Sequence, residues 1–173
     1  MMEHRLIEKM INIASKEVDI IKEDRIIDPA FIATEVDFFR TYADRTHHGK
    51  EEDILFQALE RKNMSRDDQR TKQELVDEHV RARKEVKELL EANDRYAAGD
   101  PGGLDLIMAQ LSKLIELYPG HIQKEDKLFF PNAENYFAPD ELEQMLKEFW
   151  EFDKRMIHEK YNQVYESLVK KYD

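Results

Sequence analysis

Apolar residues recur at intervals of three and four along most of the chain. This spacing places them on one side of an α-helix and is typical of helices that bury one face. The pattern is interrupted where proline, glycine or a capping residue stands. We therefore predict helices over five segments, which cover about residues 2–22, 28–62, 65–97, 104–129 and 139–172.

Two of these segments begin with start signals. Asp28 precedes Pro29, an order that combines a side chain able to cap a helix with a residue suited to its first position. Ser65 precedes Asp68 by three residues, which puts a capping hydroxyl before an acidic first turn. Both positions are predicted N-caps.

The second segment contains a histidine and a glutamate one turn apart on its predicted inner face. Residues four apart on a helix lie on the same side, so His47 and Glu51 point the same way. His48 and Glu52 form a competing pair, but their face contains more polar residues, and we expect His48 to face a groove or solvent. The predicted inner face contains Ala33, Val36, Phe39, Arg40, Ala43, His47, Glu51, Ile54 and Ala58.

The chain contains this pattern twice. HHGKEEDILF, at residues 47–56, aligns with HIQKEDKLFF, at residues 121–130, and each copy follows a Glu-His pair. His4 stands 43 residues before His47, and His79 stands 42 residues before His121. The repeat indicates a duplicated unit of the form His … His-x-x-x-Glu.

Imidazole and carboxylate groups that converge from several helices are typical of metal sites in helical bundles. The repeat offers four nitrogens and two carboxylates, and a carboxylate can bridge two ions. A set without thiolate suits iron, manganese or zinc, and shared carboxylates favour a redox-active di-iron pair over a closed structural zinc site. The candidate metal ligands are His4, His47, Glu51, His79, His121 and Glu125.

Three other residues near this pattern are predicted to have no ligand role. Lys50 and Lys124 precede the two glutamates and are expected to point outward in surface ion pairs. His158 lies on the last helix, outside the repeat.

Composition narrows the function classes. A net charge of −11 argues against a nucleic-acid partner, because phosphate binding needs a basic face. The absence of cysteine excludes disulfides and iron–sulfur clusters. No apolar run is long enough for a membrane span and no signal-peptide pattern opens the chain, so we expect a cytoplasmic protein. Residues 1–173 are expected to form one domain, with a bundle over about residues 2–134.

These residues resemble the hemerythrin-like (HHE cation-binding) domains. The resemblance rests on Glu3-His4-Arg5, Tyr42–Glu52, Glu78-His79 and His121–Asp126, and covers nearly the whole chain. It implies an all-α, up-down four-helix bundle with an additional C-terminal helix. It also implies a non-haem di-iron centre bridged by oxo or hydroxo groups and by Glu51 and Glu125.

One departure bears on function. Oxygen-carrying hemerythrins have two histidines one turn apart on the third helix, whereas here Arg83 stands four residues after His79. The chain looks more similar to the symmetric four-histidine, two-glutamate proteins, so reversible oxygen carriage is not expected.

We expect a protein that binds or reacts with O2, NO or peroxide in sensing, scavenging or stress protection, supplied by an electron donor. Zinc or manganese is an alternative metal. The alternative functions are an iron store or donor for damaged iron centres, and a structural or interaction bundle with a metal staple. No residue is assigned a catalytic role.

Overall fold

The computed structural model describes the backbone of residues 2–169 and the side chains of residues 3–156 and 160. These residues form five helical rods and no strand. The predictions of an all-α fold and of a C-terminal helix after the bundle are confirmed. The rods are α1 (Met2–Asp24); α2 (Pro29–Phe38) continued by η1 (Phe39–His48), η2 (Glu51–Phe56) and α3 (Gln57–Leu59); α4 (Arg66–Ala97); α5 (Gly102–Lys124) continued by η3 (Glu125–Phe129) and α6 (Phe130–Glu134); and α7 (Pro139–Val169).

Side chains cap two of these rods at the predicted positions. Oδ1 of Asp28 accepts a hydrogen bond from the backbone N–H of Ala30 at 2.9 Å. Oγ of Ser65 accepts one from the N–H of Asp68 at 3.1 Å. Each bond satisfies a donor that has no partner within the helix, which is why the rods begin here.

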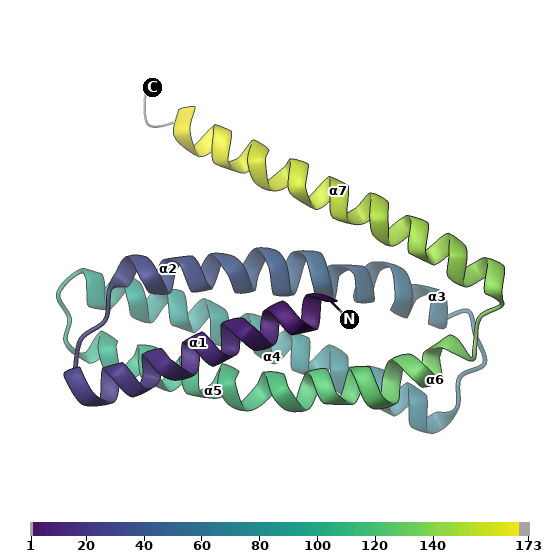
Figure 1. The fold of residues 1–173 in the computed structure, drawn as a ribbon, viewed down its shortest axis with the longest axis horizontal. Helices are drawn as coiled ribbons and strands as arrows, with labels where there is room; N and C mark the ends of the chain where they lie inside the picture. The colour runs from purple at the N-terminus through teal and green to yellow at the C-terminus, as the bar shows by residue number, and fades with distance from the viewer. Residues whose placement is uncertain (1, 170–173) are drawn as a thin grey trace.

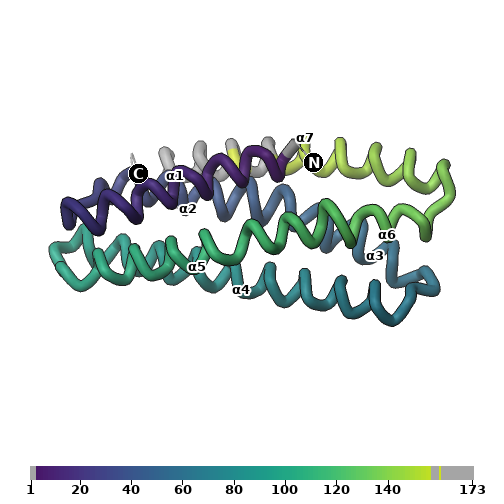
Figure 2. Tube along the Cα trace, turned by 60° about the horizontal axis from the view of Figure 1, so that its bottom comes forward, coloured from purple at the N-terminus to yellow at the C-terminus, as the bar shows by residue number. Residues whose placement is uncertain are grey.

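The first four rods pack side by side into a bundle that is roughly square in cross-section. α4 lies against α5 and against α2, and α1 lies against α5 and η1 (Figures 1 and 2). α7 stands outside the square, leaves the end marked by α3 and α6, and contacts η1 and η2 (Figure 1). The fold is therefore a four-helix bundle with a fifth helix laid across it.

Three stretches of the second and fourth rods, η1, η2 and η3, are π-helical. In a π-helix each N–H bonds to the carbonyl five residues earlier, so one turn contains more residues than an α-helical turn. Buried positions in the second rod therefore recur every four residues past Ala43, at His47, Glu51, Leu55 and Leu59.

The wider turns overturn part of the predicted inner face. Ile54 and Ala58 are only half-buried. The α-helical period predicted inward positions at 54 and 58, whereas the wider π-helical turns place them one residue later, at Leu55 and Leu59. Ala33 is exposed, because Ile32 has the inward position and buries a larger apolar side chain. Arg40 is also exposed, so these four assignments are wrong.

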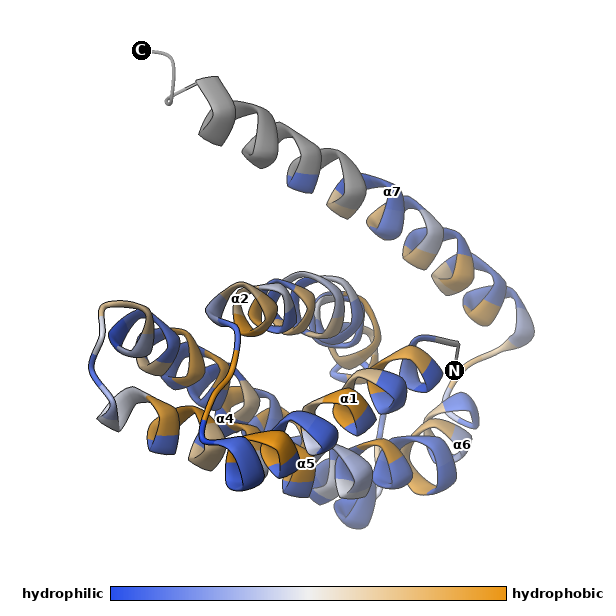
Figure 3. Ribbon diagram, turned by 60° about the vertical axis from the view of Figure 1, so that its left-hand side comes forward, coloured by the Kyte–Doolittle hydropathy of each residue, from blue (hydrophilic) through white to orange (hydrophobic). Residues whose placement is uncertain are grey.

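The buried apolar residues form two clusters at opposite ends of the bundle. On the second rod one cluster ends at Ala43 and the other begins at Leu55. On the fourth rod the corresponding limits are Ile122 and Phe129. The layer between the clusters contains the buried histidines and glutamates of the repeat. Hydrophobic and hydrophilic residues alternate along the ribbon of each rod (Figure 3). Within the described part of the chain, no helix combines the length and the hydrophobicity of a membrane span.

Glu35 on α2 is a buried carboxyl outside this polar layer. It is 1% exposed and neither of its oxygens has a hydrogen-bond partner. Burial, together with the nearby Glu17 carboxylate, raises the pKa of Glu35 to about 7.

We therefore expect Glu35→Gln to stabilise the protein at alkaline pH. A folded-state pKa above the unfolded value makes the folded state bind the extra proton, so the wild-type protein loses stability as pH rises from about 4.5 to 7. Relative to wild type, the variant should gain up to about 3 kcal/mol in unfolding free energy between pH 4.5 and pH 8. Urea unfolding of the variant and the wild type at pH 4.5 and at pH 8 measures this gain, and the exposed Glu23→Gln is the control. If the variant and the wild type differed in unfolding free energy by the same amount at both pH values, the prediction would be refuted.

Candidate metal centre

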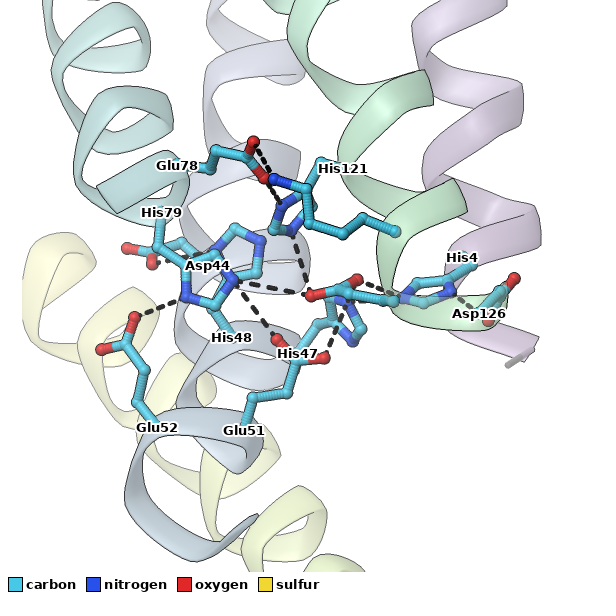
Figure 4. A network of polar contacts seen from close by, with 12 residues as sticks. His4, Asp44, His47, His48, Glu51, Glu52, Glu78, His79, His121 and Asp126 are labelled. Carbon is cyan, nitrogen blue, oxygen red and sulfur yellow. Dashed lines mark hydrogen bonds and ion pairs between the residues drawn. The ribbon is translucent and has the colours of Figure 1, made fainter. Parts of the chain in front are cut away.

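The six residues predicted as ligands lie together in the polar layer. They come from four different rods, α1, α4 and the two rods that contain η1–η2 and α5–η3, and each is at most 3% exposed. Figure 4 shows the labelled histidines and Glu51 directed toward one another from these helices. The π-helical stretches carry both glutamates, so the wide turns occur at the site itself.

His4, His47, Glu51 and Glu125 form the first group, whose ligand atoms lie close enough to share one cation. The Nε2 atoms of His4 and His47 are 3.0 Å apart. Oε2 of Glu125 lies 3.1 Å from Nε2 of His4 and 4.0 Å from Nε2 of His47. Oε1 of Glu51 lies 3.6 Å from Nε2 of His47.

His79 and His121 face the other oxygens of the same two glutamates. Oε1 of Glu125 lies 3.2 Å from Nε2 of His121 and 3.7 Å from Nε2 of His79. Oε2 of Glu51 lies 3.4 Å from Nε2 of His79. Each carboxylate thus has one oxygen toward the first group and one toward His79, which is the arrangement of a bridging ligand.

His48 belongs to a second group with His79 and His121, which also lies within the span of one cation. The prediction that His48 faces a groove or solvent is wrong, because its side chain is 1% exposed. Its ring stacks on that of His79 at a centroid distance of 3.9 Å, and neither ring nitrogen has a hydrogen-bond partner. Both His47 and His48 face the interior because the π-helical η1 turns less from one residue to the next than an α-helix does.

Carboxylates outside the centre orient four of the histidines. Nδ1 of His4 lies 2.9 Å from Asp126 and Nδ1 of His79 lies 2.7 Å from Glu52. Nδ1 of His47 lies 3.2 Å from Glu3, and Nδ1 of His121 lies 2.9 Å from Glu78. An ionised carboxylate can only accept, so each Nδ1 donates and leaves the Nε2 lone pair directed inward, ready for a cation.

These four carboxylates follow the internal repeat. Glu3 corresponds to Glu78, and Glu52 corresponds to Asp126 in the aligned copies. No role was predicted for these carboxylates, although their repetition at matching positions was a signal that could have identified them.

The lysines of the repeat hold two of the carboxylates in place. Lys50 forms a close ion pair with Glu3, and Nζ of Lys124 lies 2.7 Å from Oε1 of Glu78. Lys50 is only 6% exposed, so the prediction of an outward surface pair is wrong for it. It is buried because α7 covers it, where Oδ1 of Asp153 lies 2.8 Å from its Nζ.

The pKa values of the outer carboxylates support their role as acceptors of hydrogen bonds from the histidines. Burial opposes ionisation of Glu3, but hydrogen bonds from His47 and Lys50 outweigh it and lower the pKa of Glu3 to about 2. Burial also opposes ionisation of Glu78, and bonds from His121 and Lys124 lower its pKa. These groups remain ionised acceptors at neutral pH.

The pKa values of the two central glutamates, Glu51 and Glu125, are shifted in opposite directions. Burial and the neighbouring Glu125 carboxylate raise the pKa of Glu51 well above its usual value. For Glu125, burial opposes ionisation, but the attraction of the nearby histidine rings, those of His4 and His79 first, outweighs it and lowers the pKa of Glu125. Without a cation two buried carboxylates this close do not both ionise, so cation binding would displace a proton.

The donor set fits divalent or trivalent cations. Eight side-chain atoms of these residues are buried without a hydrogen-bond partner, a cost that proteins seldom accept without a ligand. The inward lone pairs of His4 and His47, 3.0 Å apart, also repel unless a proton or cation lies between them. The unpartnered atoms are both ring nitrogens of His48, both oxygens of Glu51 and of Glu125, and Nε2 of His79 and of His121. The side chain of His158 lies outside the described residues.

The sequence matches one protein-family model, which is described as "Hemerythrin HHE cation binding domain". The match covers residues 1–133 and, in a second overlapping stretch, residues 70–167. No match was found among curated proteins or among solved structures.

Proposed function

Because the chain belongs to the hemerythrin HHE cation-binding domain family, we propose that it holds two iron ions and binds or reacts with O2, NO or peroxide. The family match confirms the resemblance seen in the sequence. Buried histidine and glutamate clusters support a cation site in this domain.

The observation that carries the proposal is the position of Glu125. Its two oxygens face histidines of both groups, at 3.1 Å from Nε2 of His4 and at 3.2 Å from Nε2 of His121. A carboxylate so placed would join two cations and hold them close together. A single structural zinc ion would need only four protein ligands in a tetrahedron.

In this proposal the six predicted ligands, His4, His47, Glu51, His79, His121 and Glu125, hold the ions, and His48 is an additional nitrogen donor beside His79. Iron held by nitrogen and oxygen donors supplies redox chemistry toward small ligands. The protein orients the imidazoles through their outer carboxylates and keeps bulk water away through the apolar clusters on both sides.

Burial of the site favours this function over iron storage or donation. The six ligands are at most 3% exposed, and no cysteine is available to pass iron onward. A store that releases its metal needs a more accessible site.

Metal analysis and rapid mixing test the proposal. The protein purified from its own host should contain two iron ions per chain, one for each group, and show an absorption band of a bridged ferric pair. The reduced form should combine with O2 or NO in stopped-flow mixing, faster than a chelator removes its iron. A single colourless zinc per chain would support the structural alternative instead, and iron lost to the chelator before any reaction would support storage.

A further inference from the structure

Lys50 and Lys124 occupy matching positions of the repeat but differ in their surroundings. Nζ of Lys124 lies 2.7 Å from Oε1 of Glu78 on α4. Nζ of Lys50 pairs with Glu3 of α1 and also lies 2.8 Å from Oδ1 of Asp153 on α7. The Lys50 side chain is 8% exposed, whereas the Lys124 side chain is 22% exposed. α7 therefore contacts the outer partners of the first half of the repeat through Lys50.

A chain of contacts with alternating charge leads from α7 to the first group. Asp153 is anionic, Lys50 is cationic and Glu3 is anionic, and Oε2 of Glu3 lies 3.2 Å from Nδ1 of His47. Burial opposes the charge of Lys50, but its bonds to Asp153 and Glu3 outweigh burial and raise the pKa of Lys50. A cation on Nε2 of His47 would add a positive charge at the inner end of this alternation. Each charge in the chain thus favours its neighbours.

Apolar packing fixes the position of Asp153 beside Lys50. The ring of Phe152 lies so close to Gly49 that an added Cβ would be 2.9 Å from its Cζ. Phe152 is 6% exposed and directly precedes Asp153, and Gly49 directly precedes Lys50. An apolar contact and an ion pair therefore join α7 to the second rod at one point, and movement of α7 away from that rod would break both.

We propose that Lys50 and Asp153 are positioning residues through which the docking of α7 sets the cation affinity of the first group, an inference that rests on the proposed metal centre. With α7 docked, Asp153 holds Lys50, Lys50 holds Glu3, and Glu3 keeps the Nδ1–H of His47 bonded so that Nε2 points inward. Without α7, the ammonium of Lys50 keeps only Glu3 as a partner and draws that carboxylate away from His47. Because coupling between two binding events is reciprocal, a cation in the first group also holds α7 on the bundle.

The second half of the repeat is an internal control. Glu78 orients His121 and pairs with Lys124, so the outer partners of His121 lie on α4 and α5. Substitution of Lys124 therefore disturbs an equivalent lysine–carboxylate–histidine chain that does not pass through Asp153.

Hydrogen exchange of the full-length protein tests the reciprocal effect. Addition of Co²⁺ to the metal-free protein should slow amide exchange in residues 139–156 of α7 by about fivefold. Lys124→Met should keep this effect, whereas Lys50→Met should abolish it. Exchange in α7 that Co²⁺ leaves unchanged in the wild-type protein would overturn the proposal.

Competition with a chelator that reports free Co²⁺ tests the effect on affinity. Asp153→Asn removes the outer charge at nearly constant shape and should weaken Co²⁺ binding by about fivefold. Glu151→Gln, on the exposed side of α7, should not change the affinity. The Asp153→Asn substitution should have no further effect in a Lys50→Met background and its full effect in a Lys124→Met background. Equal effects in the two backgrounds would show that Asp153 does not act through Lys50, and the proposal would be wrong.

Failure of this inference and failure of the proposed function give different results. Binding of two Co²⁺ ions without any coupling to α7 would refute the inference and leave the metal centre. Coupling in a protein whose reduced iron form never reacts with O2 or NO would refute the proposed function and leave the inference. Melting curves first show whether each variant folds; if Lys50→Met does not, exchange in the wild-type protein and the affinity of Asp153→Asn still decide.

Discussion

Replacing Glu51 and Glu125 together with alanine should remove both metal ions from the protein. Oxygens of Glu125 lie 3.1–4.0 Å from the Nε2 atoms of four histidines, and those of Glu51 lie 3.4–3.6 Å from two. In the proposed centre these two glutamates bridge the ions, so their removal would leave only imidazoles on each side. Since loss of an outer partner alone costs roughly 10–100-fold in metal affinity, loss of both bridging ligands should cost more.

The single variants should rank in a definite order. Glu125→Ala should lose more metal than Glu51→Ala, because Glu125 contacts histidines of every helix in the site, whereas Glu51 contacts only His47 and His79. Elemental analysis per chain measures both, and Glu116→Ala on the exposed face of α5 is the matched control. Unchanged metal content in the double variant would show that the ligand assignment is wrong.

Stripping the metal should lower the stability of the folded protein by several kilocalories per mole. The metal-free interior buries imidazoles and carboxylates that have no hydrogen-bond partners, including both oxygens of Glu51 and of Glu125. A ligand present at a thousand times its dissociation constant stabilises the folded state by about 4 kcal/mol. For a chain of this size that corresponds to a fall in Tm of roughly 8–16 °C.

Calorimetry before and after treatment with a chelator measures this effect. Restoring the metal should restore the Tm, and the chelator should not change the Tm of the Glu51→Ala, Glu125→Ala double variant. An identical Tm with and without metal in the wild-type protein would mean that the buried polar layer is stable by itself.

Much of the site could be predicted because its signals are local. A histidine and a glutamate four residues apart share a helix face whatever the rest of the chain does. The duplicated pattern then identified the same pair in both halves, at His47 with Glu51 and at His121 with Glu125. The helix starts at Asp28 and Ser65 were equally local, since each depends on one side chain and the next few backbone N–H groups.

Errors arose where the prediction needed the exact winding of the helix. His48 was assigned outward on an α-helical period, but η1 is π-helical and both neighbouring histidines face the interior. The same winding moved the buried positions from Ile54 and Ala58 to Leu55 and Leu59. Side-chain pattern alone did not distinguish the two windings, because the π turns form where the rods pack around the polar layer.

The sequence by itself determined that this chain forms amphipathic helices and that two copies of one histidine–glutamate unit occur on them. Periodicity and repetition are properties of neighbouring residues and need no knowledge of the fold. Only the tertiary structure decided which oxygens of Glu51 and Glu125 face which histidines and that Lys50 is buried beneath α7. Those features depend on how separate helices pack, and packing joins residues that are more than 100 positions apart, such as Lys50 and Asp153.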